Sequence, residues 1–324
     1  MFKKALAFFL CLVMMASVWT VGAMAAEESA AGGASGRMGG GRSGMMGGMG
    51  GGTSQGHYTE AAAYFEQFEY TDEETGLTIP YNLYLPEGYE ESETETYPLV
   101  IFIADSSVNS NNVTDVLTQD GATVWATEEE QEKHPCIVLA PQYTTDLISR
   151  IGMLTTDENV WTEGLTLVKS LMDYIVAEYR VDEDRIYGTG QSQGGMSAIA
   201  ISDRYPDFYA AQLLVACQWD VEEMSAMVDD HLWIIVCEGD IKAYPGMNGA
   251  TALWMELGAD VATDDMWDST SDAETFDELV AGMLDQDCAI NYNVFEGGNH
   301  MYTWTVAYTI EGIRDWLFEQ AKDA

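Results

Sequence analysis

One stretch of the sequence, Arg185-Ile-Tyr-Gly-Thr-Gly-Gln-Ser-Gln-Gly-Gly-Met196, constrains the fold more than any other. A β-prone run, Ile186 to Thr189, leads into Gly190-Gln-Ser192-Gln-Gly194, and the residues that follow favour a helix. A strand, a sharp turn and a helix with Gly-x-Ser-x-Gly at the turn form the pattern of a nucleophile elbow. The central serine adopts a strained backbone, and Gly190 and Gly194 lack the Cβ atoms that would clash with neighbouring chain. The pattern predicts that Ser192 is a nucleophile above a sheet.

The rest of the chain alternates β-prone and helix-prone segments. Continuous apolar runs such as 98–104 and 136–140 are typical of strands buried on both faces. We therefore expect an α/β domain with a mostly parallel central sheet of about eight strands and helices on both faces. The expected strands are 64–70, 77–85, 98–104, 136–140, 186–189, 210–216, 232–237 and 290–295, and the expected helices are 121–130, 161–179, 196–201, 247–257, 276–284 and 305–321. Residues 260–272 are predicted to be an acidic loop.

The first residues have the features of a secretory signal. Lys3 and Lys4 precede an apolar run over 5–18, and Ala23-Met-Ala25 fits the small-x-small cleavage rule. We expect a signal peptide over 1–25, a Gly/Met-rich leader over 26–56 and a catalytic domain over 57–324. The sequence therefore predicts a secreted, extracellular protein that is not inserted in a membrane once the signal is removed.

The chain is strongly acidic. Its 54 acidic and 13 basic residues give a formal net charge of −41. Nucleic acids and anionic membranes need basic patches, so we exclude both as partners and expect a small-molecule or polymeric substrate. The acidic clusters over 128–130 and 264–265 leave calcium binding open, but no loop has the regular ligand spacing of a calcium site, so we assign neither a cofactor nor a metal ion.

Four cysteines follow the predicted signal: Cys136, Cys217, Cys237 and Cys288. They are too few for a disulfide scaffold in a domain of this size. We expect all four to be small buried side chains, although Cys217 and Cys237 end strands that could be neighbours.

A serine hydroxyl needs a general base, which is usually a histidine. The chain has four histidines. His57 lies at the edge of the leader, and His134 and His231 each precede a strand, at the wrong end of the sheet for the site. His300 follows the last expected strand in a Gly-Gly-Asn-His loop. We therefore predict that His300 is the base for Ser192.

The histidine in turn needs an acid that fixes its tautomer. Asp240 follows a strand end and lies between Ser192 and His300 in the chain, as the order serine, acid, histidine requires. Glu238 and Asp220 are rivals. We favour Asp240 because Gly239 gives the loop freedom to reach His300.

Acyl transfer also requires donors for the developing oxyanion. One is expected to be the backbone N–H of Gln193, directly after the nucleophile. The second is expected from the loop after strand 98–104, and Ser106 is our choice. We expect the neighbouring Asp105 to turn away from the oxyanion and to bond locally.

With these residues in place, the chain from Tyr64 onward resembles the α/β-hydrolase superfamily. Within it, the chain is similar to the secreted polyhydroxybutyrate-depolymerase and feruloyl-esterase-like group, whose members are often labelled predicted peptidases. The shared motifs are Pro98-Leu-Val-Ile-Phe, Ala140-Pro-Gln142, Gly190-Gln-Ser-Gln-Gly-Gly-Met196, Tyr205-Pro-Asp-Phe208, Glu238-Gly-Asp240 and Asn299-His300. The resemblance implies esterase chemistry through an acyl-enzyme, with Ser192, Asp240 and His300 as the triad. Many members carry His-Gly where this chain has Ala104-Asp105, which leaves the second oxyanion donor open.

Three functions are compatible with this sequence. The first is a serine carboxylic ester hydrolase acting on phenolic, acetyl or polyester-type esters. Trp219, Tyr244 and Trp304 then form either a pocket wall or part of the core. The second is a peptidase like the prolyl oligopeptidases, which usually carry propeller repeats that this chain lacks. The third is a surface binding protein without turnover, for which the loop at Asp105 is the only support.

Overall fold

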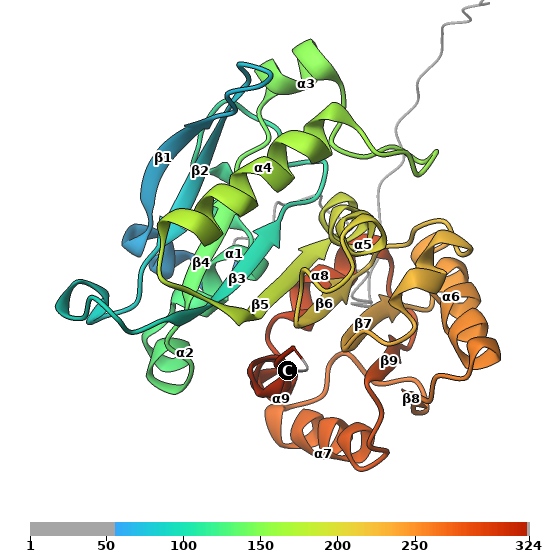
Figure 1. The fold of residues 1–324 in the computed structure, drawn as a ribbon. Helices are drawn as coiled ribbons and strands as arrows, with labels where there is room; N and C mark the ends of the chain where they lie inside the picture. Colours follow the sequence, from blue (N-terminus) through green and yellow to red (C-terminus); the bar gives the residue numbers. More distant parts are fainter. Residues whose placement is uncertain (1–55, 323–324) are drawn as a thin grey trace, which may run out of the picture. The chain divides into compact units, whose positions relative to one another are not determined.

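The computed structural model describes residues 56–322, which form a nine-stranded sheet between helices (Figure 1). The predicted signal peptide and the leader, up to residue 55, lie outside the described residues. The strands are β1 (Glu66–Thr71), β2 (Thr78–Tyr84), β3 (Tyr97–Ile103), β4 (Ile137–Pro141), β5 (Val181–Gln191), β6 (Ala211–Val215), β7 (Leu232–Cys237), β8 (Val261–Thr263) and β9 (Ile290–Phe295).

The strand order is β1-β2-β4-β3-β5-β6-β7-β9-β8. Strands β1 and β2 form an antiparallel hairpin, and β2 pairs antiparallel with β4. Every further pairing, from β4 to β8, is parallel. The predicted α/β fold with a mostly parallel sheet is therefore confirmed. The prediction of a loop over 260–272 is wrong in part, because β8 lies within it and adds a ninth strand at the edge, beside β9.

Helices cover both faces of the sheet (Figure 1). The α-helices are α1 (Asp120–Thr123), α2 (Glu128–Lys133), α3 (Thr145–Ile151), α4 (Glu163–Glu178), α5 (Gln193–Arg204), α6 (Ala243–Leu257), α7 (Ala273–Leu284), α8 (His300–Ala307) and α9 (Glu311–Glu319). Short 3-10 helices are η1 (Thr59–Tyr64), η2 (Tyr89–Glu91), η3 (Asp115–Thr118), η4 (Val124–Ala126) and η5 (Glu223–Met227).

Two hydrophobic clusters fill the space between the sheet and these helices. Strand β3 shows how they arise, because successive strand side chains point to opposite faces. Leu99 and Ile101 join the cluster formed with α3, α4, α5 and α6. Val100 and Phe102 join the cluster formed with α1, α7, α8 and α9. This two-sided burial explains why the central strands are continuous apolar runs in the sequence.

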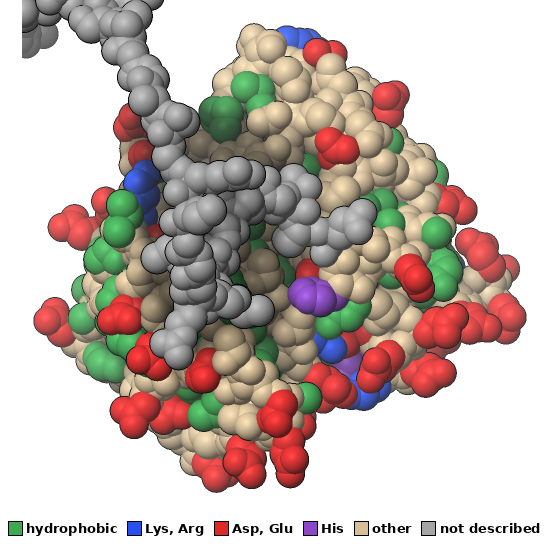
Figure 2. Space-filling view, turned by 180° about the vertical axis from the view of Figure 1, so that it is seen from behind, with side chains coloured by type: hydrophobic (Ala, Val, Ile, Leu, Met, Phe, Trp, Pro, Cys, Tyr) green, Lys and Arg blue, Asp and Glu red, His purple; other side chains and the backbone are tan. Residues whose placement is uncertain are grey.

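The surface is as acidic as the composition indicates. Figure 2 shows one face on which Asp and Glu side chains are spread widely, with few Lys or Arg side chains between them. Within residues 56–322, no helix is both long and apolar enough to span a membrane.

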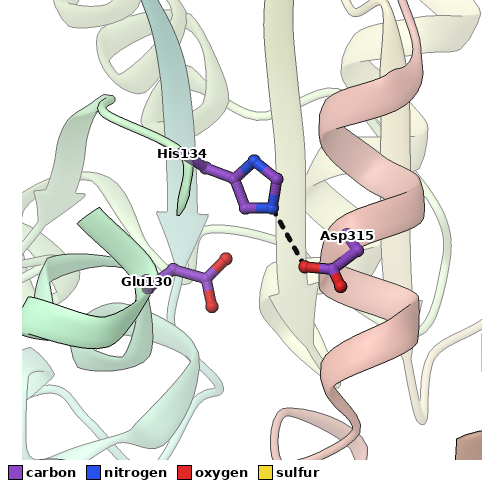
Figure 3. A group of neighbouring side chains, drawn as sticks. All are labelled: Glu130, His134 and Asp315. Carbon is purple, nitrogen blue, oxygen red and sulfur yellow. Dashed lines mark hydrogen bonds and ion pairs between the residues drawn. The ribbon is translucent and has the colours of Figure 1, made fainter. Parts of the chain in front are cut away.

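Helix α9 is joined to α2 by a buried ion pair. Arg314 Nε lies 2.7 Å from Glu130 Oε2, and both side chains are less than a tenth exposed. Beside them, His134 Nε2 lies 2.9 Å from Asp315 Oδ1 (Figure 3). Glu130, His134 and Asp315 form a close group. Because Arg314 already neutralises Glu130, we interpret the group as an ion-pair network that holds the C-terminal helix.

Candidate active site

Ser192 lies at the turn between β5 and α5 in a conformation that side chains rarely adopt. Its φ is 52° and its ψ is −119°, and such a positive φ costs a residue other than glycine about 1–3 kcal/mol. Hydrogen bonds hold the turn on both sides. The Ser192 N–H donates to the carbonyl of Val215 at 3.0 Å, and the Ser192 carbonyl accepts from the N–H of Met196 at 2.9 Å. The turn therefore has the strained geometry that the Gly-x-Ser-x-Gly pattern predicts.

The two glycines of the motif are required by close backbone packing. A Cβ atom on Gly194 would lie 1.7 Å from the carbonyl oxygen of Ile103, and one on Gly190 would lie 2.5 Å from the backbone of Gly194. Since these contacts are with backbone, no side-chain rotation relieves them. Any side chain at either position would push α5 away from the sheet.

His300 lies 108 residues further along the chain than Ser192 but beside it in space. Its Nε2 atom lies 2.7 Å from Ser192 Oγ. His300 is the first residue of α8, directly after a turn in which Gly297 and Gly298 have φ values of 63° and 67°. These left-handed residues reverse the chain after β9. The imidazole is thereby brought to the nucleophile elbow.

Asp240 lies behind the imidazole. Its Oδ2 is 2.5 Å from His300 Nδ1, and its Oδ1 accepts from the N–H groups of Lys242 and Ala243 at 3.1 and 3.0 Å. Burial by itself raises the pKa of Asp240, but the hydrogen bonds from His300, Ala243 and Lys242 outweigh burial and lower this pKa. The carboxylate is therefore ionised and accepts only, so Nδ1 carries the proton and the Nε2 lone pair faces Ser192.

The two rival acids are engaged elsewhere. Glu238 Oε2 accepts a hydrogen bond from the N–H of Gly297 at 3.2 Å. Asp220 Oδ1 accepts from the N–H groups of Glu222 and Glu223 at the start of η5.

Each of the other histidines also has a different partner. These pairs are His57 with Asp120 at 2.7 Å, His134 with Asp315 at 2.9 Å and His231 with the carbonyl of Ala210 at 3.3 Å. Asp240 and His300 are thus the acid and the imidazole that reach Ser192.

The residues predicted for the oxyanion hole share one cleft with the triad residues. The cleft has a volume of about 510 Å³ and is lined by Ser106, Gln193, Ser192, Asp240 and His300 together with residues that sequence reasoning missed. The missed residues include Thr155, Thr156, Asp157 and Lys242. The Thr-Thr-Asp stretch lies in the connection between α3 and α4, where no motif marks it.

Asp105 does turn towards local partners. Its carboxylate is 3% exposed and accepts from the N–H of Ser107 at 2.8 Å. It also accepts from the side-chain amides of Gln191, at 3.1 Å, and Gln119. The negative charge of Asp105 is therefore surrounded by three neutral hydrogen-bond donors.

The aromatic residues predicted as a pocket wall lie outside the cleft lining. Trp219 is 4% exposed, and its Nε1 donates to Glu223 at 2.7 Å. Tyr244 packs on the hydrophobic cluster beneath α6. Trp304 packs edge-on against the His300 ring, with centroids 5.4 Å apart. Trp219 and Tyr244 therefore contribute to packing, the second of the two predicted roles, whereas Trp304 contacts the imidazole of His300.

The sequence over 79–289 matches the profile of a family described as esterase PHB depolymerase, which is more than half of the chain. The chain belongs to this family. The resemblance predicted from the motifs is thereby confirmed, as is the prediction of a serine esterase. No curated protein sequence matches this esterase.

Solved structures share the fold of this esterase. A thermostable esterase superposes with a TM-score of 0.64 at 24% sequence identity, over 81% of this chain and 64% of that one. The chain thus spans about two thirds of that protein's length. A ferulic acid esterase superposes with a TM-score of 0.53 at 12% identity, over 78% of this chain and 98% of that one.

The cysteines of the esterase are free thiols within the described residues. Three are buried, but Cys288 is partly exposed, so the prediction that all four are buried is wrong for this residue. Cys217 and Cys237 lie near the site, where a Cβ on Gly195 or Gly298 would strike them. Burial raises the pKa of both thiols. Protonated thiols are weak nucleophiles, so both cysteines are expected to be unreactive.

Proposed function

We propose that this protein is a secreted serine carboxylic ester hydrolase that works through an acyl-enzyme on Ser192. The observation that carries the proposal is the continuous hydrogen-bonded chain from Asp240 through His300 to Ser192. Family membership supports the same reaction class. Secretion rests on the signal-like sequence of residues 1–25.

In the proposed reaction, Ser192 Oγ attacks the ester carbonyl carbon while His300 Nε2 takes the hydroxyl proton. The carbonyl oxygen becomes an oxyanion, which the N–H of Gln193 and the loop at Ser106 stabilise. The intermediate collapses, the C–O bond to the alcohol breaks, and the imidazolium returns its proton to the leaving alcohol. Water then attacks the acyl-enzyme by the same route and releases the acid. Esters of phenolic, acetic or hydroxyalkanoic acids are the substrates that we expect.

The test combines labelling with turnover. A fluorophosphonate is expected to label Ser192, which mass spectrometry of the digested protein identifies. The same protein is expected to hydrolyse p-nitrophenyl acetate. Ser192→Ala should abolish both signals, whereas Ser225→Ala, an exposed serine far along the chain from the elbow, should keep both. Turnover that persists in Ser192→Ala would disprove the mechanism.

A further inference from the structure

The imidazole of His300 is held at its two nitrogen atoms but remains partly exposed. Nδ1 lies 2.5 Å from Asp240 Oδ2, and Nε2 lies 2.7 Å from Ser192 Oγ. The side chain is nevertheless 37% exposed. Hydrogen bonds at the two nitrogens fix the line that joins them, but they leave the ring able to tilt about that line. A contact with the ring itself is therefore needed to fix its plane and to keep Nε2 aligned.

Trp304 supplies such a contact. It lies four residues after His300 on α8, and residues at this spacing share one face of a helix. The two rings pack edge-to-face, with centroids 5.4 Å apart and an angle of 73° between their planes, which is a favourable arrangement for aromatic rings. Trp304 Nε1 is buried and has no hydrogen-bond partner within residues 56–322. The side chain therefore acts through the contact of its ring and not through a hydrogen bond.

The helix that carries both rings is fixed on the sheet. Thr303, Val306 and Ala307 of α8 are buried. The helix packs against β7, the strand that leads to Asp240. A ring that is held against α8 is therefore also held relative to the acid of the triad.

The need for this contact changes during the proposed reaction. In the free enzyme the Ser192 hydroxyl donates to Nε2 of His300. In the acyl-enzyme, Oγ is bonded to the acyl carbon and carries no proton, so this hydrogen bond is lost. The imidazole must then take a proton from the attacking water while Asp240 alone of the triad still bonds to it. Once the water oxygen has bonded to the acyl carbon, the C–Oγ bond breaks and the proton passes from Nε2 to Oγ.

We infer that Trp304 is a positioning residue that holds the His300 imidazole for the attack of water on the acyl-enzyme. The inference rests on the proposed ester hydrolysis at Ser192. Loss of the Trp304 ring should slow deacylation more than acylation, because the hydrogen bond from Ser192 aligns the imidazole in the acylation step only. Where deacylation limits turnover, kcat and KM then fall together and kcat/KM changes little.

The test follows both steps with p-nitrophenyl acetate on the purified protein. Rapid quenching and mass spectrometry measure the rise and decay of the acetyl group on Ser192, which give the rates of acylation and deacylation separately. Trp304→Ala is expected to slow deacylation about two- to tenfold and acylation less than about twofold, so that the acetyl-enzyme accumulates. Trp304→Phe, which keeps a ring on the same face of α8, should recover most of the deacylation rate.

Phe318→Ala is the matched control, because it removes a ring that stacks on another imidazole, that of His134, with centroids 4.4 Å apart. It should leave both rates unchanged. Fluorophosphonate labelling of Ser192 measures the folded fraction of each variant, and Trp304→Leu, which keeps more volume, replaces Trp304→Ala if the latter does not fold.

Three results would overturn the inference alone. They are slowing of acylation as large as that of deacylation in Trp304→Ala, no change in either step, and no recovery in Trp304→Phe. A parent protein that forms no acetyl group on Ser192 and releases no p-nitrophenol would overturn the proposed function and the inference with it.

Discussion

The carboxylate of Asp105 accepts a hydrogen bond of 3.1 Å from the side chain of Gln191, the residue directly before Ser192. The same carboxylate accepts from the N–H of Ser107, in the loop that carries Ser106. Asp105 therefore connects the nucleophile elbow to the proposed oxyanion loop. Many members of the group that the sequence resembles carry His-Gly where this chain has Ala104-Asp105. This chain therefore holds the loop by a different set of contacts.

We predict that Asp105 acts by positioning. Asp105→Ala should lower kcat for p-nitrophenyl acetate about 10- to 100-fold with little change in KM, because misplaced oxyanion donors weaken binding of the transition state only. Asp105→Asn should recover most of kcat, since rotated amides of Gln191 and Gln119 can bond with it. Asp146→Ala, at an exposed site, is the control. A loss in Asp105→Asn as large as that in Asp105→Ala would show that the charge itself matters.

The second prediction concerns pH. The pKa of Asp240 is lowered, so this carboxylate stays ionised while an imidazole gains its proton. We expect no titration of Asp240 to appear in kcat/KM above its ordinary pKa of 3.8, because this carboxylate is already ionised there. Asp240→Asn should lower kcat by about 10³–10⁴ with the fold retained. Asp220→Asn, at the rival acid, should keep most activity. If Asp220→Asn lost activity and Asp240→Asn kept it, Asp220 and not Asp240 would be the acid that orients His300.

Much of the site was predictable from the sequence because its parts follow strand ends. Ser192, Asp240 and His300 come after β5, β7 and β9, and the carboxyl ends of parallel strands meet at one edge of a sheet. The cleft wall at Thr155 was not predictable, because its place depends on packing between distant segments. The side chain of Gln193, for example, bonds with the carbonyl of Thr155, 38 residues away.

Element boundaries near the C-terminus differ from prediction for two local reasons. The expected helix over 305–321 is divided into α8, which ends at Ala307, and α9, which begins at Glu311. In the break between them, Tyr308 packs edge-on against Phe102, with ring centroids 6.0 Å apart. Helix α8 also begins earlier than predicted, at His300, because Asn299 accepts from the N–H of Tyr302 and caps it. The capping residue Asn299 can be recognised in the sequence, whereas the break between α8 and α9 cannot be predicted from local sequence.

The third prediction concerns the ion pair that docks α9. Arg314 also donates from Nη1 to the carbonyl of Tyr308 at 2.7 Å, and the Oε1 atom of Glu130 has no partner within the described residues. Arg314→Leu would leave the Glu130 carboxylate buried and unpaired, so we expect a loss of about 3–5 kcal/mol in the free energy of unfolding. The double variant with Glu130→Leu should recover most of it. Lys133→Ala, which removes exposed ion pairs, should cost less than about 1 kcal/mol in urea unfolding.

The fourth prediction concerns stability against pH. Burial, and then the charges of Asp207 and Asp229, raise the pKa of Asp230 from 3.8 to about 6. The folded chain thus holds this proton more tightly than the unfolded chain, so the contribution of Asp230 to stability falls as pH rises from about 4 to about 6. Asp230→Asn removes the charge. Because the side chain is only half-buried, we expect a gain of about 1–2 kcal/mol at pH 7.5.

The pH dependence of this stability gain distinguishes a specific effect of Asp230 from a general reduction of the negative charge of the chain. At pH 4, Asp230 is mostly protonated in the folded chain, so thermal unfolding of Asp230→Asn should match that of the parent protein there. Asp277→Asn makes the same change of net charge at an exposed position on α7. It should raise the unfolding temperature far less at pH 7.5. Equal gains from the two variants would mean that the total charge of −41, and not the surroundings of Asp230, limits stability.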